Sequence, residues 1–217
     1  MPFNSNAELA QHLIASGVLK SRNLKTAFQV IDRSHFVPSA LVSQAYEDHP
    51  LPIGLGQTIS QPTTVAFMLE LLRPEPGNRV LEVGAGSGYV VALLAQAVGK
   101  RGQVVALERL PELVALAKSN LAPYKFSNLE LIHADGSLGW PDIESFDRII
   151  VSAAALALPT ELTAQLSLGG RLVAPVGDYP QDVVLVEKAA DGLHMCHYPG
   201  FVFVPLIPGK RGQSEVK

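Results

Sequence analysis

The sequence contains little cysteine, few aromatic residues and no long apolar run. Its single cysteine, Cys196, permits no internal disulfide and is typical of a chain in a reducing compartment. No apolar run approaches the roughly 20 residues that a bilayer span needs. No N-terminal stretch combines the basic, apolar and small-residue regions of an export signal. We therefore expect a cytoplasmic protein that does not contact a membrane.

An excess of charge of either sign is also absent. The 17 Lys and Arg residues nearly balance the 20 Asp and Glu residues, for a net charge of −3, and this balance argues against a nucleic-acid surface. The sequence shows no cluster of metal-ligating residues and no convincing nucleophile–base pair, so no metal site is expected. With 217 residues, 47% of them hydrophobic, the chain can form one domain with a substantial core.

What the sequence does contain is a glycine-rich turn between an apolar strand and a helix. The strand is predicted at 79–83, the glycines are Gly84, Gly86 and Gly88, and the helix is predicted at 89–98. Glycine tolerates positive φ and, without a Cβ, lets a ligand lie against bare backbone. The unpaired N–H groups at the start of the helix favour an anionic group. The pattern predicts a pocket for the polar end of a nucleotide-like cofactor.

The spacing of these glycines limits the choice of cofactor. Dinucleotide-binding folds usually show G-x-G-x-x-G, whereas this chain has G-x-G-x-G, with Glu82 two residues before the first glycine. That form is commoner in S-adenosylmethionine sites. Because glycine-rich turns also occur without any ligand, the turn alone leaves the cofactor open.

A second acidic residue strengthens the prediction of an adenosine site. The strand predicted at 103–107 ends at Glu108, whose carboxylate could accept both hydroxyls of a ribose. The alternative is a solvated glutamate paired with Arg109, which would contribute little stability. The order of strand, glycine turn, helix, strand and acid favours adenosine binding.

Strands and helices alternate along most of the chain, and this pattern predicts an α/β fold with a doubly wound, mostly parallel sheet. We expect a single domain: a helical annex and substrate loop at 1–62, a cofactor-binding core at 63–178, and C-terminal strands with a loose tail at 179–217. Further strands are predicted at 129–133, 147–152, 171–176 and 201–206, helices at 111–117 and 160–166, and an antiparallel pair at 183–187 and 193–198.

Ligands of such sheets lie beyond the carboxyl ends of the strands. We therefore expect Gly84, Glu108, Asp135 and Ser152 to lie close together. Asp135 could accept a hydrogen bond from an adenine amino group, or it could form an Asx turn before the following glycine. Ser60 precedes a predicted helix, and its local sequence fits a helix cap and a substrate contact equally well.

Several motifs together resemble the protein-L-isoaspartate O-methyltransferases. The resemblance covers nearly the whole chain, and the motif Thr58-Ile59-Ser60-Gln61-Pro62 is its most specific part. The matching segments are 50–54, 56–62, 80–84, 86–89, 108–109, 111–113, 135–136, 139–141, 146–151, 169–172 and 203–206.

The resemblance implies a Rossmann-like methyltransferase fold and a specific reaction. A methyl group passes from S-adenosyl-L-methionine, leaving S-adenosyl-L-homocysteine, to the free α-carboxylate of L-isoaspartyl residues in damaged proteins and peptides. The ester then collapses to a succinimide, which partly hydrolyses to a normal aspartyl linkage. The resemblance also implies a monomer.

The resemblance assigns roles to individual residues. Ser60 matches the family's active-site residue, Glu108 its ribose acceptor and the pair Asp135-Gly136 its adenine site. The residues expected to contact the cofactor are Gln57, Thr58, Ile59, Ser60, Glu82, Gly84, Ala85, Gly86, Ser87, Glu108, Arg109, Asp135 and Gly136.

Some positions depart from the family pattern, and two other functions stay open. Leu55 stands where members often carry histidine, Val65 where animal members carry a cofactor-contacting histidine, and Ala85 where serine or threonine is frequent. These departures bear on contacts and affinity more than on the reaction. The alternatives are an NAD(P)-dependent oxidoreductase that uses the same turn and Glu108, and a catalytically silent protein that only binds S-adenosylmethionine.

Overall fold

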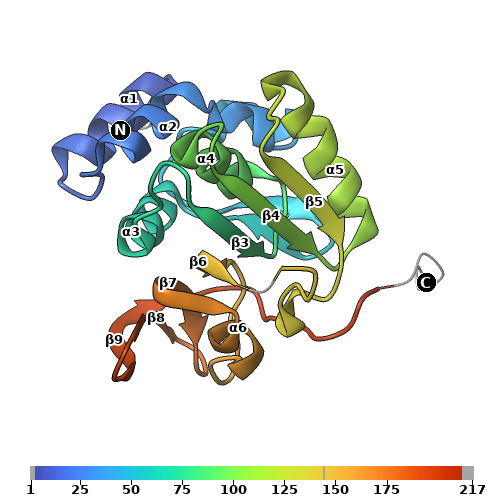
Figure 1. Ribbon diagram of the computed structural model, residues 1–217. Coiled ribbons are helices and arrows are strands. Elements are labelled where there is room, and N and C mark those ends of the chain that lie inside the picture. Colours follow the sequence, from blue (N-terminus) through green and yellow to red (C-terminus); the bar gives the residue numbers. More distant parts are fainter. Residues whose placement is uncertain (1–2, 144, 212–217) are drawn as a thin grey trace.

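A seven-stranded sheet organises the molecule (Figure 1). The computed structural model describes residues 3–143 and 145–211, so the tail beyond Arg211, which we expected to be loose, lies outside the described residues. The strand order is β5-β4-β3-β6-β7-β8-β9. The strands are β3 (Arg79–Val83), β4 (Gln103–Glu108), β5 (Leu129–His133), β6 (Phe146–Val151), β7 (Leu166–Val176), β8 (Gln181–Ala189) and β9 (Gly192–Phe201).

The pairing confirms the predicted fold class. Strands β3 to β7 are parallel to one another, and β8 and β9 extend the sheet as an antiparallel pair. The helices are α1 (Asn6–Ala15), α2 (Arg22–Val30), α3 (Pro62–Leu72), α4 (Tyr89–Val98), α5 (Pro111–Leu121) and α6 (Thr160–Ala164), with 3-10 helices η1 (Arg33–Phe36), η2 (Ser39–Gln44), η3 (Ala122–Tyr124) and η4 (Gly136–Leu138). Within the described residues, no helix is long and apolar enough to cross a membrane.

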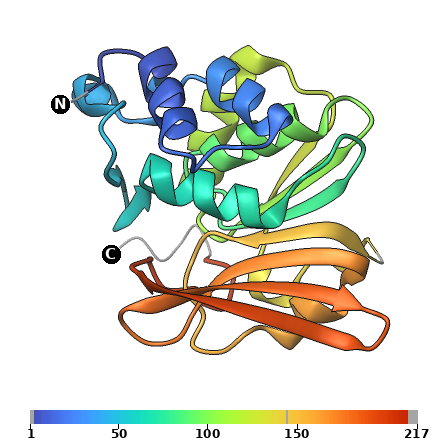
Figure 2. The same ribbon diagram turned by 90° about the vertical axis from the view of Figure 1, so that its left-hand side faces the viewer.

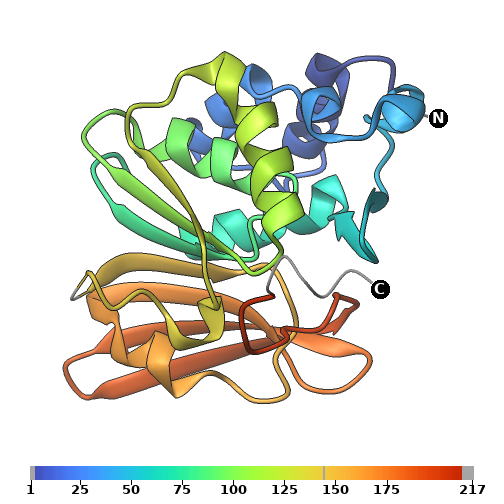
Figure 3. The same cartoon turned by 90° about the vertical axis from the view of Figure 1, so that its right-hand side faces the viewer.

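The two faces of the sheet carry separate apolar cores, because successive side chains of a strand point to opposite faces. Val80 joins the core formed with α1 to α5, whereas its neighbour Leu81 joins the core that contains Leu162 of α6. Figures 2 and 3 show the N-terminal helices on the opposite side of the molecule from β7 to β9. Helix α4 buries eight of its ten residues, since it lies against both the sheet and α2.

The substrate loop expected within 1–62 contains a short antiparallel hairpin. Strand β1 (Leu51–Gly54) pairs with β2 (Gln57–Ile59), and Leu51 lies opposite Ile59. The turn between them places Leu55 at φ 53°, a conformation that L residues other than glycine seldom adopt. Ile53 of this hairpin lies close to the turn after β3, with its Cδ1 3.5 Å from the position that a Cβ of Gly86 would take.

Two predictions at the end of the chain were wrong. The expected strand at 201–206 is absent: β9 ends at Phe201, and among residues 202–211 only Pro205 forms an isolated bridge, to Ala154. Val204 and Leu206 make main-chain hydrogen bonds with Ala154, which lies in a loop, and the Phe203 N–H donates to the side chain of Gln181. The helix expected at 160–166 is shorter: α6 ends at Ala164, and β7 already begins at Leu166.

Candidate active site

The turn after β3 has the conformation that the glycine pattern predicts. Gly84, Gly86 and Gly88 have φ of 91°, 54° and 89°, all in the left-handed region that favours glycine. The main-chain N–H groups of Gly84 and Ala85 both donate to the Leu107 carbonyl at the end of β4, over 2.8 and 3.1 Å. The turn is therefore fixed against the neighbouring strand while one side faces a cavity.

Glu108 at the end of β4 is part of the same structure. Its carboxylate accepts from the Gly86 N–H over 3.0 Å and from the Leu110 N–H over 2.9 Å. The residue is 5% exposed, and Arg109 donates instead to the Gly209 carbonyl, so the alternative of a solvated pair with Arg109 was wrong. Each carboxylate oxygen keeps a second lone pair, which leaves room for a further donor such as a hydroxyl.

Glu82 is more deeply buried than Glu108, with 1% of its surface exposed. One carboxyl oxygen accepts from the Ser152 hydroxyl over 3.3 Å, and the other is the buried Oε2, which has no hydrogen-bond partner among the described residues. Burial raises the pKa of Glu82 well above its usual value; the Ser152 hydrogen bond lowers it and the charge of Glu108 raises it further. A buried carboxyl group with a free oxygen fits a cationic ligand.

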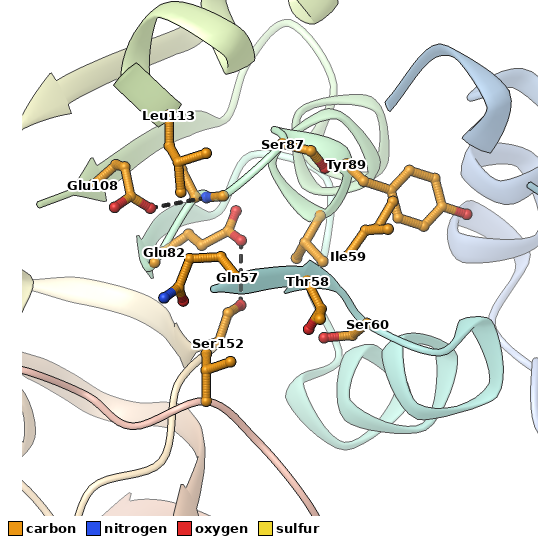
Figure 4. A pocket seen from close by; sticks show the side chains of 15 residues that line it. Gln57, Thr58, Ile59, Ser60, Glu82, Ser87, Tyr89, Glu108, Leu113 and Ser152 are labelled. Atoms are coloured by element: carbon orange, nitrogen blue, oxygen red, sulfur yellow. Dashed lines mark hydrogen bonds between the residues drawn. The ribbon is translucent and has the colours of Figure 1, made fainter. Parts of the chain in front are cut away.

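Ser60 faces this cavity from the other side. In Figure 4 the side chains of Thr58 and Ser60 project from the β2 segment opposite Glu82 and Ser152. The helix cap interpretation of Ser60 was wrong, because Gln61 is the cap residue of α3 and Asp48 accepts the Thr63 N–H over 2.8 Å. The Ser60 hydroxyl makes no hydrogen bond within the part of the chain that the structure describes.

Two adjoining cavities meet at this segment. The first lies against the glycine turn and encloses about 60 Å³; the second has about 620 Å³ and lies between α3 and the chain after β9. Thr58, Ser60, Ser152 and Val204 line both. Because ligand sites usually enclose about 300 Å³ or more, a nucleoside-sized ligand would extend beyond the first cavity. The predicted residues that line the first cavity are Gln57, Thr58, Ile59, Ser60, Glu82, Gly84, Ala85, Gly86, Ser87 and Glu108.

Arg109, Asp135 and Gly136 do not line this cavity. Asp135 forms the Asx turn: it accepts from the Ser137 N–H over 2.9 Å and from the Ser137 hydroxyl over 2.7 Å, and its other oxygen accepts from the Gly209 N–H over 2.6 Å. Burial opposes ionisation of Asp135, but these hydrogen bonds outweigh it and lower its pKa. Contact of these three residues with adenine stays a prediction.

Sequence reasoning missed several residues that line the cavities. Tyr89 and Leu113 line the first cavity, Val204 lines both, and Phe201 lines the second. The helical spacing of Leu113 marks a buried face without marking a ligand site. Val204 arrives from the C-terminal segment, and no local pattern could have indicated its position, although the motif at 203–206 was part of the family resemblance.

Comparison with known proteins agrees with this geometry. Residues 4–211 match the family model "Protein-L-isoaspartate(D-aspartate) O-methyltransferase". The protein-L-isoaspartate O-methyltransferase of Methanopyrus kandleri is 44% identical over 210 residues, covering 95% of this chain and 92% of that protein. The one of Anaeromyxobacter dehalogenans is 49% identical over 189 residues, covering 86% and 88%.

Solved structures give the same result. The fold matches the crystal structure of a putative protein-L-isoaspartate O-methyltransferase from Plasmodium falciparum in complex with S-adenosyl-L-homocysteine, with a TM-score of 0.84 and 27% identity over 94% of this chain and 99% of that chain. A second structure named protein-L-isoaspartate O-methyltransferase matches with a TM-score of 0.84 and 29% identity, over 92% of this chain and 65% of that chain. The chain therefore belongs to the protein-L-isoaspartate(D-aspartate) O-methyltransferase family.

Proposed function

We propose that the two cavities are the donor and acceptor halves of one methyltransferase site. As a member of its family, the enzyme transfers a methyl group from S-adenosylmethionine to the free α-carboxylate of L-isoaspartyl residues in proteins and peptides, and so initiates their repair through a succinimide. The family membership does not favour the oxidoreductase alternative. We further propose that the enzyme acts as a cytoplasmic monomer, without nucleic acid or membrane partners.

The donor half is the cavity at the glycine turn. S-adenosylmethionine supplies a methyl group activated by a sulfonium charge. Glu108 would accept the ribose hydroxyls with its free lone pairs. Glu82, with its free buried oxygen, would balance positive charge near the methionine end. Gly84 and Gly86 would let the ligand approach the main chain. The fully buried acid and the left-handed glycines are the features of this chain that fit the donor.

The acceptor half is the larger cavity. Its lining contains polar side chains from the hairpin and α3 and apolar ones from the chain after β9, and among the described residues no lysine or arginine lines either cavity. The free α-carboxyl group of an isoaspartyl residue has a pKa of about 3.5 and is ionised at neutral pH, so it needs no general base. The protein has to orient the carboxylate and exclude water. Because opposite charges are neutralised during transfer, a dry site with fixed donors favours the reaction.

One observation carries the assignment of the acceptor site: the Ser60 hydroxyl lies at the junction of the two cavities and has no partner in the described residues. We assign it as the donor that orients the substrate carboxylate. A hydrogen bond to a charged group contributes about 1.5–3 kcal/mol. Removing it in Ser60→Ala should therefore lower kcat roughly 10- to 100-fold.

Methyl transfer to an isoaspartyl peptide, with the aspartyl isomer as substrate control, measures this effect. Calorimetric titration with S-adenosylhomocysteine measures cofactor affinity, which should stay within about twofold because Ser60 acts on the acceptor. Ser119→Ala, on the exposed face of α5, is the matched variant and should change neither quantity. An unchanged rate in Ser60→Ala would contradict the proposed role, and loss of cofactor affinity would show a role in the fold instead.

A further inference from the structure

Arg33 is a fully buried cation in the N-terminal annex, with 0% of its surface exposed. It belongs to η1 and lines neither cavity. Its guanidinium donates three hydrogen bonds, all to main-chain carbonyls: Nε to Ala45 over 2.9 Å, Nη1 to Ser60 over 2.9 Å, and Nη2 to His49 over 3.3 Å. One side chain therefore contacts three separate points of the chain around the hairpin.

No carboxylate of the described residues lies within ion-pair distance of this guanidinium. Burial lowers the pKa of Arg33 to about 10, although electrostatic interactions with Tyr89 and Asp48 raise it. A buried charge is destabilising unless its hydrogens are satisfied, and apolar residues of similar volume often stabilise a core as well or better. Packing alone therefore does not explain an arginine at this position.

The three carbonyls show what the side chain holds. Ala45 and His49 precede the β1–β2 hairpin, and Ser60 follows it, so Arg33 joins the two ends of the segment that presents Thr58 and Ser60 to the cavities. Asp48 adds a second connection at the same place, because it accepts hydrogen bonds from the main chain and the hydroxyl of Thr63 and from the Gln61 side chain. Arg33 and Asp48 therefore both connect the chain before the hairpin to the chain after it.

The guanidinium also contacts the opposite wall of the site. Its central carbon lies 5.4 Å from the centre of the Tyr89 ring, within the range of a cation–π interaction. Tyr89 is the first residue of α4, directly after the glycine turn, and it lines the donor cavity. Arg33 thus lies between the segment that carries Ser60 and the helix that begins at the donor-binding turn.

We propose that Arg33 is a positioning residue for methyl transfer, which fixes the main chain at Ser60 relative to the glycine turn and thereby aligns acceptor and donor. This inference rests on the proposed role of Ser60. Arg33 itself reaches neither substrate nor cofactor, so it acts through the geometry of the Ser60 segment. Alignment of this kind is sensitive, since a displacement of about 1 Å can lower a rate 100-fold.

Arg33→Lys tests the proposal, because lysine keeps the charge but cannot bind three carbonyls with a planar fork. We expect kcat on an isoaspartyl peptide to fall about 10-fold or more, with the dissociation constant for S-adenosylhomocysteine within about threefold of the wild-type value. Arg148→Lys is the matched control. Arg148 also donates to two main-chain carbonyls, of Arg73 and Asp147 over 2.9 and 2.8 Å, but it lines neither cavity, and its variant should keep the wild-type kcat.

The double variant Arg33→Lys/Ser60→Ala separates positioning from general damage to the fold. If Arg33 acts through Ser60, the double variant should be hardly slower than Ser60→Ala alone. Rate losses that multiply would overturn the inference, and so would an Arg33→Lys enzyme that has a lower melting temperature but a wild-type kcat. Arg33→Gln, which removes the buried charge but keeps one donor, provides the same test if the lysine variant does not fold.

The two proposals fail in different ways. If Ser60→Ala is impaired and Arg33→Lys is not, only the inference about Arg33 is wrong. If Ser60→Ala has the wild-type rate, the proposed role of Ser60 is wrong. A low rate in Arg33→Lys would then mean that Arg33 affects the reaction through a residue other than Ser60, and this result would also overturn the inference.

Discussion

The charge of the Glu82 carboxyl group depends on what the donor cavity contains. Without a cation, burial favours the protonated form of the group, because it raises the pKa of Glu82 well above the ordinary value. Protonation then stabilises the folded state. That stabilisation is fully present below the unfolded pKa of about 4.3 and is lost as the pH rises toward the raised folded value. The binding residue is thus a source of instability at neutral pH.

Glu82→Gln should remove this pH dependence, because the amide keeps the shape but does not ionise. We expect the melting temperature of the variant, relative to that of the wild type, to rise between pH 5 and pH 8. An increase of about 3 °C corresponds to roughly 1 kcal/mol for a chain of this size. Thermal unfolding of both proteins without ligand, across that pH range, measures the difference. A difference that stays constant with pH would show that Glu82 ionises as easily in the folded as in the unfolded chain.

The same variant has an expected cost in function. Glutamine cannot balance the positive charge of S-adenosylmethionine, so the affinity for this ligand should fall. Stability gained together with affinity lost is the usual relation at a binding site whose residues are kept for function.

The sequence predicted the positions and roles of some site residues better than those of others. The acid at the end of a predicted strand placed Glu108 correctly at the cavity, because strand ends are set by local pattern. The role of Ser60 could not be decided from its local sequence, since a serine before a helix is as consistent with a helix cap as with a substrate contact. The structure excludes the cap, because Asp48, which is 15 residues from Thr63 in the sequence, accepts the hydrogen bonds of Thr63 at the start of α3.

Among the elements, the glycine turn gives the most direct test of ligand binding. Gly84 and Gly77 have nearly the same φ, 91° and 92°, but only Gly84 lines the donor cavity. An alanine at either position has to adopt a left-handed conformation, at about 1–2 kcal/mol. We expect Gly84→Ala and Gly77→Ala to lose similar stability, whereas only Gly84→Ala should bind S-adenosylhomocysteine more weakly, by about 10-fold.

Thermal unfolding and calorimetric titration of both variants provide the comparison. No atom of the described residues lies within 4 Å of a methyl group added at Gly77, so its variant isolates the effect of backbone conformation. Equal affinities in the two variants would mean that the ligand does not approach the main chain at Gly84.

The elements that the sequence predicted well are those buried on both faces. Strand β3 is buried from Val80 to Val83 and β4 contains the apolar run 104–107, and the helices that follow begin at recognisable signals, a glycine turn for α4 and a proline for α5. The hairpin at 51–59 was not predicted, because its two strands are only 4 and 3 residues long. The false strand at 201–206 had the right composition, but its position in the fold offers it a loop as partner instead of a sheet edge.

At the scale of the whole molecule, the site exists because distant segments meet at one edge of the sheet. The parallel strands bring their carboxyl ends together, as their order predicts. The annex adds the hairpin on one side, and the chain after β9 adds Val204 on the other. The order of strands could predict where the site lies, but not which segments cover it.

This arrangement also predicts how the enzyme responds to salt. The substrate is an anion and the protein has a net charge of −3, yet no cationic side chain lines the cavities among the residues that the structure describes. Recognition must then rely on neutral donors at short range, which dissolved ions screen little, whereas steering by distant charges falls steeply with ionic strength. We expect the Michaelis constant for an isoaspartyl peptide of neutral flanking sequence to change less than about twofold between roughly 0.05 and 0.5 M sodium chloride. If the Michaelis constant instead rose by about 10-fold or more, long-range attraction by a basic surface would be indicated, and the neutral hydroxyl of Ser60 could not then be the principal group that holds the carboxylate.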